Sequence, residues 1–164
     1  MKGGVAIIDL EAAAKRLGRD VAILTELKEF GVPLRDQLAA SQKDFQEQID
    51  RLKASLGGKP SEADKQKLAE LTRTLSQQLQ QKQQQAQQEL NSKKAALVSR
   101  FREEIKPVAL KIATGKGLGI VQLKTDLTIL ASEPELDITD EVVAELTRTT
   151  SASASPSPSP SPNP

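Results

Sequence analysis

Apolar residues recur with a period of eleven along the middle of the chain. Eleven residues in three turns give about 3.67 residues per turn, close to the 3.6 of an α-helix, so such a row stays on one helix face. The spacing predicts one long, nearly straight helix over residues 61–112, roughly 75 Å in length, which must project beyond a small domain. The first row is Leu68, Leu79, Leu90, Phe101 and Ile112, and the second is Leu75, Ala86, Leu97 and Val108.

The preceding segment carries the same period, which indicates where the partner for that face comes from. Gly57 to Pro60 form a cluster that breaks helices, and Ser61 with Asp64 three residues later is close to a capping box. We therefore predict an antiparallel helical hairpin over residues 20–112 with its tip at 57–60. Two unrelated amphipathic helices are the alternative, but a shared phase on both sides of a turn favours the hairpin. The first row of this segment is Ile23, Leu34, Phe45 and Leu56.

Two prolines fall inside the predicted helices. Proline lacks an amide donor and its ring clashes with the preceding turn, so Pro33 predicts a kink or a helix restart. Pro107 lies near the base of the second helix, and a kink there would turn that helix into the rest of the protein.

Short apolar runs on both sides of the hairpin predict a small β body. The run at 5–10 favours a buried strand, and the runs at 119–123 and 127–131 favour a β-hairpin. Thr139 is the expected cap of a final helix that ends near residue 148. The expected division is a body of residues 4–19 and 113–148, helical arms of residues 20–112, and a disordered Ser-Pro tail of residues 149–164.

Composition limits the chemistry that the chain can perform. It contains neither Cys nor His, which removes disulfides, thiolate zinc sites, histidine bases and cysteine nucleophiles. The glycine-rich run at 113–119 resembles a phosphate-binding loop only superficially, because it ends a helix and precedes a strand, the reverse of what such a loop requires. We therefore expect no enzyme activity, no cofactor and no metal.

Charge and hydropathy bear on location and partners. The net charge of +1 hides a basic segment at 59–112, with eleven Lys or Arg against six acids, and an acidic one at 113–164, with three against seven. The basic segment could steer an acidic partner, although a solvated helix surface explains it equally well. No run of eighteen apolar residues exists, so we expect no stable membrane insertion, and we expect no nucleic acid. The first five residues lack the apolar core of a signal peptide, which fits a cytoplasmic protein or a mature exported one.

The order of strand, short helix, long helix, tip, long helix, two strands and short helix resembles the Skp/OmpH family of periplasmic chaperones. The similarity spans residues 4–148 and is most specific at its two ends. Residues 5–10 are similar to the first strand of the family, and residues 119–121 with 127–130 are similar to its β-hairpin. Residues 137–142, Asp-Ile-Thr-Asp-Glu-Val, are similar to the start of its last helix and form the most specific match.

The resemblance implies a mainly α fold with a small β body, in which strands of three subunits form a β-barrel and the helical hairpins project like tentacles around a cavity. It implies an ATP-independent holdase that shields unfolded outer-membrane proteins in the periplasm, without a cofactor. The aliphatic surface of the strands is also large for so thin a monomer, which favours a homotrimer. The residues expected in the trimer body are Val5, Ile7, Ile8, Ile120, Leu123, Leu127 and Ile129.

Two other functions fit the same pattern. A structural or adaptor protein would use the helical arms as a spacer and the tail as a linker. A prefoldin-like cytosolic chaperone is a third hypothesis, but prefoldin subunits place helices at both chain ends, whereas strands bracket the arms here.

Overall fold

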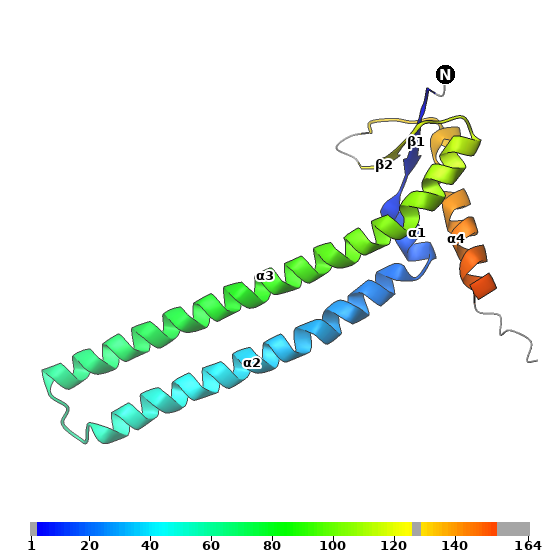
Figure 1. Ribbon diagram of the computed structural model, residues 1–164. Helices are drawn as coiled ribbons and strands as arrows, with labels where there is room; N and C mark the ends of the chain where they lie inside the picture. The colour runs from blue at the N-terminus through cyan, green and yellow to red at the C-terminus, as the bar shows by residue number, and fades with distance from the viewer. Residues whose placement is uncertain (1–2, 126–128, 154–164) are drawn as a thin grey trace, which may run out of the picture. The chain divides into compact units, whose positions relative to one another are not determined.

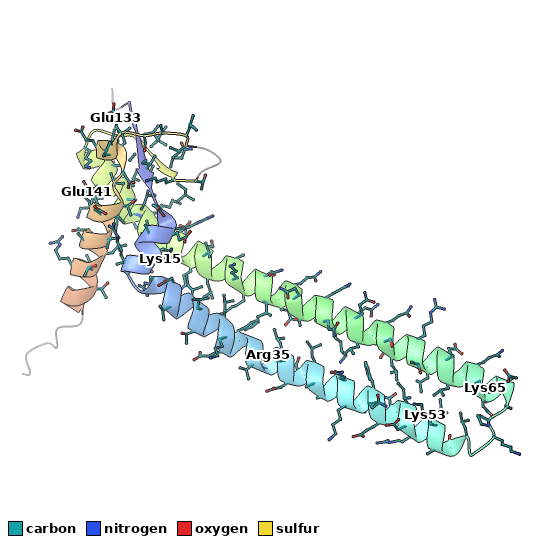
Figure 2. All side chains as sticks on the ribbon, turned by 180° about the vertical axis from the view of Figure 1, so that it is seen from behind. Lys15, Arg35, Lys53, Lys65, Glu133 and Glu141 are labelled. Carbon is teal, nitrogen blue, oxygen red and sulfur yellow. The ribbon has the colours of Figure 1, made fainter. Side chains whose placement is uncertain are left out.

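The computed structural model describes residues 3–125 and 129–153, with side chains as far as Thr150, and divides into two compact units (Figure 1). The second unit is Leu24–Ala96, and the first contains the described residues before and after it. The fold is mainly helical with a small sheet, as the apolar pattern predicts.

The second unit is a pair of antiparallel helices that lie side by side (Figure 1). It contains most of α2 (Arg19–Ser55) and of α3 (Glu62–Gly115), and one end of each helix extends into the first unit. The predicted helix restart at Pro33 is wrong, because α2 continues through Pro33 without interruption, and α3 likewise continues through Pro107. Gly31 is buried next to Leu90 of α3, and this packing offsets the loss of one backbone hydrogen bond at the proline.

The tip between the two helices contains the predicted capping box. The Ser61 N–H donates to Asp64 Oδ2 at 3.1 Å, and the Asp64 N–H donates to Ser61 Oγ at 3.2 Å. The Ser61 hydroxyl also donates to Asp64 Oδ2 at 2.7 Å, and this bond, followed by the one from the Ser61 N–H, lowers the pKa of the Asp64 carboxyl below its ordinary value. Gly57 has a φ of 69°, a conformation that glycine adopts at little cost. The tip sequence therefore ends one helix and begins the next.

The first unit contains a parallel two-stranded sheet of β1 (Val5–Ile8) and β2 (Ile120–Leu123). Val5 pairs with Ile120 and Ile8 pairs with Leu123, and the chain returns to β1 at an isolated parallel bridge between Ile7 and Asp137. Ile7 is therefore paired on both sides.

The predicted β-hairpin of residues 119–123 and 127–131 is wrong for the residues that the structure describes. The first run does form a strand, but its partner is β1, and residues 129–131 form no strand. Leu127 lies outside the described residues, as does Thr128. The physical reason is the free edge of β1, where Gly4 and Ile8 carbonyls accept N–H groups on either side of β2. Sequence spacing alone could not reveal this long-range pairing.

The core of the first unit lies between the sheet and helices α1 (Leu10–Arg16), α3 and α4 (Thr139–Ser153), and a short 3₁₀ helix, η1 (Pro134–Leu136), precedes α4. The four core alanines on α1 and α3 allow these helices to pack closely against their neighbours. The buried core residues are Ala6, Ile8, Ala13, Ala14, Phe101, Ile105, Ala109, Ala113, Ile138, Val142 and Leu146.

Helix α4 is longer than the sequence predicts. It continues to Ser153, so the expected start of a disordered tail at residue 149 is wrong. Near its end the hydroxyls of Thr149 and Thr150 both donate to the Leu146 carbonyl. The rest of the predicted tail, residues 154–164, lies outside the described residues.

Candidate functional site

The sheet of the first unit presents an exposed apolar pair and buries its other aliphatic residues. Val5 is 37% exposed and its partner Ile120 is 59% exposed, whereas Ile7 and Ile8 retain 4% and 2% of their accessible surface. Of the residues expected in the trimer body, Ile7 and Ile8 are therefore already covered within one chain. The outer edge of β2 pairs with no other strand within residues 3–125 and 129–153. An unpaired strand edge beside exposed aliphatic side chains is a natural place for another chain to add.

The segment that follows β2 carries a second exposed apolar residue. Leu123 and Ile129 are half-buried, and the Ile129 N–H donates to the Thr125 carbonyl at 3.0 Å. Leu130 has a relative exposure of 103%, so one chain leaves this side chain entirely in water. Sequence reasoning placed Leu130 in the predicted β-hairpin and did not name it as a site residue. Its position in a short aliphatic run was the feature that could have identified it.

The predicted rows of the second unit do line the contact between α2 and α3, but not equally. Leu75, Ala86 and Leu97 of the second row are buried, whereas Leu68, Leu79 and Leu90 of the first row are half-buried. Leu34 and Phe45 of α2, and Leu56 directly after its end, are also half-buried. The first α3 row thus lies at the margin of the contact, where its apolar surface remains accessible.

Beyond Ala96 the buried face of α3 changes its spacing. Leu97, Phe101, Ile105, Ala109 and Ala113 are all buried and lie four residues apart, whereas Ile112 is only half-buried. The four-residue row drifts around the helix relative to the eleven-residue rows, because α1, α4 and the sheet replace α2 as neighbours in the core. The eleven-residue period therefore describes the second unit better than the first.

A polar row of α3, in which Lys82, Lys93 and Glu104 lie eleven residues apart, also contacts α2. The Lys82 ammonium donates to Ser41 Oγ at 3.0 Å. The Lys93 ammonium lies 2.7 Å from Glu26 Oε1 and 5.7 Å from the centroid of the Phe30 ring. In the first unit, Glu104 of the same row forms an ion pair with Arg19. These contacts show that the polar residues of this row are part of the helix contact.

Packing is loose at one place in the second unit. A cavity of about 170 Å³ lies between α2 and α3, and Ser41, Lys82 and Ala86 are among the residues that line it. Small Ala86 occupies a row position where leucine stands at Leu75 and Leu97, which leaves space that polar side chains border.

A buried hydroxyl connects the start of α4 to the end of β1. Thr139 is 5% exposed, and its Oγ1 accepts the Asp9 N–H at 2.9 Å and donates to Asp137 Oδ1 at 2.5 Å. The same Asp137 oxygen accepts the Thr139 N–H, so Asp137 and not Thr139 satisfies this backbone group at the start of α4. The predicted cap, Thr139, instead connects α4 to Asp9 at the end of β1. Lys124 completes the network through an ion pair with Asp137 at 3.0 Å.

Two opposing effects determine the protonation of Asp137. Burial raises the pKa of its carboxyl, but hydrogen bonds from Thr139 and Lys124 lower it by more, and the pKa lies below its ordinary value. The carboxylate is therefore ionised near neutral pH and holds the network together.

The described residues offer two kinds of surface for binding. Among residues 3–125 and 129–150, no three acidic side chains lie close enough to hold a metal ion. Within the same part of the chain, no helix is both long and apolar enough to cross a membrane. What the geometry provides is an open strand edge and a long, partly apolar helix pair.

The family model described as Outer membrane protein (OmpH-like) matches residues 4–146, which is most of the chain. The chain belongs to the OmpH-like family. This confirms the resemblance on which the fold prediction relies.

A solved OmpH-like structure shares the fold of this chain. It comes from Caulobacter crescentus CB15 and is named as an outer membrane chaperone (OmpH-like). The two chains are 21% identical, with a TM-score of 0.62, and the match covers 90% of this chain and 85% of the other. A comparison with curated proteins gives no match.

Residues 137–142, the segment most similar to the OmpH-like family, contribute both to a polar network and to the core of the first unit. Asp137 and Thr139 build the polar network, while Ile138 and Val142 are fully buried in the core of the first unit. Sequence reasoning identified this segment but missed its partner Asp9. The Asp9 N–H donates to Thr139 Oγ1, although the two residues are 130 positions apart in the sequence.

Proposed function

We propose that this chain is an ATP-independent holdase chaperone of the periplasm that shields unfolded outer-membrane proteins. Membership of the OmpH-like family over residues 4–146 carries this proposal. The fold shared with the Caulobacter crescentus CB15 protein, which is named as an outer membrane chaperone, supports the same role. A chaperone of this kind binds by many weak contacts and needs neither a nucleotide nor a catalytic residue.

The working form in this proposal is a homotrimer. The exposed pair Val5 and Ile120 and the open outer edge of β2 support association through the sheet of the first unit. A second chain that added to this edge would satisfy the unpaired backbone groups of β2 and cover aliphatic surface at the same time. Three copies would place three helix pairs around a common space in which a client is held.

Oligomer mass and one surface charge test the assembly. Ile120→Asp places a carboxylate on the exposed pair, where water solvates it in the single chain, and association would bury it at high cost. The matched control is Leu110→Asp, which charges another exposed aliphatic residue on α3. We expect trimer mass for the unchanged chain and for the control, and monomer for Ile120→Asp. A stable monomer of the unchanged chain at micromolar concentration would refute the assembly.

Aggregation of an unfolded client tests the activity. A β-barrel membrane protein is diluted from urea with the full chain in excess, and light scattering is followed without nucleotide. We expect the full chain to suppress scattering. Scattering that develops as it does without the chain would refute the holdase proposal, whatever the oligomeric state.

A further inference from the structure

Glutamine occupies most positions of α3 over three turns in the second unit. Between residues 77 and 88 the only other residues are Leu79, Lys82 and Ala86, and these three belong to the face that α2 partly covers. All the glutamines are exposed. The glutamine band consists of Gln77, Gln78, Gln80, Gln81, Gln83, Gln84, Gln85, Gln87 and Gln88.

This band is free of charge on a helix that is otherwise densely charged. From Arg73 to Glu89 the only ionisable side chain between the two is Lys82, and its ammonium is directed to Ser41 of α2. The segment at 62–73, by contrast, carries charged residues in every turn. The glutamine band therefore presents no feature that attracts acidic or basic partners, and salt has little to screen there.

Most amides of the band are available to a partner. Gln85 donates to Glu89 and Gln87 donates to Asn91, each one turn along the helix. The other seven side chains hydrogen-bond to none of the residues that the structure describes. They hold donors and acceptors in water over three consecutive turns.

We infer that the glutamine band binds the uncharged backbone of an extended, unfolded polypeptide. The inference rests on the proposed function, because it specifies which chemical group of the client the helix pair holds. A glutamine amide offers the same donor and acceptor groups as a peptide bond. An unfolded chain exposes one N–H and one C=O per residue that its own secondary structure no longer pairs.

The chemistry of the band selects this occupant over others. Within residues 77–88 a basic segment would find no opposite charge, an acidic segment would find only Lys82, which donates to Ser41, and an apolar segment would find only the half-buried Leu79. The unfolded strands of a β-barrel membrane protein fit, because roughly ten-residue runs of alternating polarity expose many neutral backbone groups. Each contact is weak and exchangeable, so a client is retained by their number and can still be released.

The test compares two sets of glutamine substitutions in the full chain. Alanine removes the amide and favours the helix, and the chosen band positions share one face and have no hydrogen bond within the described structure. The band variant is Gln81→Ala, Gln84→Ala and Gln88→Ala together. The control is Gln42→Ala, Gln46→Ala and Gln66→Ala, three exposed glutamines outside the band.

Affinity for a fluorescently labelled, urea-unfolded β-barrel membrane protein is the readout, at about 50 mM and about 500 mM NaCl. The Kd of the unchanged chain should differ less than about twofold between the two salt concentrations. The band variant should raise Kd about fivefold or more, and the control should stay within about twofold. Replacing the same three band residues by glutamate preserves side-chain shape and should make binding dependent on salt.

Several results would overturn the inference. Binding by the band variant within about twofold of the unchanged chain would show that the amides are inert. Equal weakening by the control would remove any special role of the band, and so would a glutamate variant whose affinity stays indifferent to salt. A full chain that binds no client and prevents no aggregation would overturn the proposed function and this inference together, whereas the first three results leave the proposed function intact.

Discussion

Replacing Thr139 by valine should destabilise the protein far more than its small change in shape suggests. Valine keeps the volume of threonine but removes the hydroxyl that accepts from the Asp9 N–H and donates to Asp137 Oδ1. The lost bond to the carboxylate is worth about 1.5–3 kcal/mol, and the unsatisfied N–H costs about 1–3 kcal/mol. The sum, about 2.5–6 kcal/mol, is a large part of the stability of an ordinary domain, about 5–15 kcal/mol.

Urea unfolding followed by far-ultraviolet circular dichroism measures this loss. All variants are compared at one protein concentration, because association would make the midpoint depend on it. Thr150→Val is the matched control: it lies on the same helix, and its exposed hydroxyl only donates back to the Leu146 carbonyl. We expect the control to stay within about 0.5 kcal/mol of the unchanged chain. A Thr139→Val variant that also stays within that range would refute the role given to the network.

The same substitution should change how stability depends on pH. The pKa of Asp137 is lower in the folded state than in the unfolded state, so the unfolded state binds more protons in acid. The stability that Asp137 contributes is therefore present above its ordinary pKa of about 4 and is lost as the pH falls through the folded value. Thr139→Val removes one cause of the lowered pKa and should flatten stability between about pH 5 and pH 3. An unchanged slope would contradict this reasoning.

Three further predictions concern the second unit. Gly31→Ala should raise stability by about 0.5–1 kcal/mol in thermal unfolding, because the added Cβ would lie 3.5 Å from Leu90 Cδ2, an ordinary contact, and helices disfavour glycine. Gly57→Ala, at positive φ, should instead lower the melting temperature, and equal effects of the two would contradict this. Lys93→Met should lower the free energy of unfolding in urea by about 0.5–1 kcal/mol, since it removes a half-exposed ion pair and a cation–π contact. A variant more stable than the unchanged chain would contradict this prediction. Deleting residues 45–55 and 62–72 together removes three turns from each helix in phase and should preserve helix content, whereas deleting residues 80–84 rotates the remainder by roughly 130° and should reduce it; equal helix content in circular dichroism would refute the phase argument.

Local and periodic features of the fold were accessible from the sequence. The eleven-residue rows identify the two long helices, since helical periodicity depends only on residues close in the chain. The tip was accessible for the same reason, because Ser61 and Asp64 pair across a single turn of helix. The helix restart expected at Pro33 does not occur, and the packing of the nearby Gly31 against α3 is a tertiary contact that local sequence does not reveal.

Features that depend on contacts distant in sequence were not accessible. The partner of β2 is β1, more than one hundred residues earlier, and spacing alone favoured a neighbouring strand instead. The connection of Asp9 to Thr139 has the same character, because neither residue carries a local sign of the other. Of the candidate surfaces, the apolar rows were predictable, whereas the exposed pair Val5 and Ile120 depends on which aliphatic residues the fold happens to bury.

The polar row of α3 helps to define the register of the two long helices, which the apolar rows leave ambiguous. Rows that repeat every eleven residues pack equally well when one helix slides by eleven, so apolar contacts alone do not define a unique register for the two helices. In the observed register three pairs are in contact: Lys82 with Ser41, Lys93 with Phe30, and Glu104 with Arg19. Each step of eleven residues forward along α3 matches a step of eleven residues back along α2, so all three pairs belong to the same antiparallel register. A slide of eleven residues in one direction would place the Lys82 ammonium opposite Leu52, which offers no hydrogen-bond partner, and a slide in the other direction would place Lys93 opposite Arg19, a like charge. The few polar residues on this face thus oppose slipped pairings of α2 and α3, at the cost of the loose packing around Lys82.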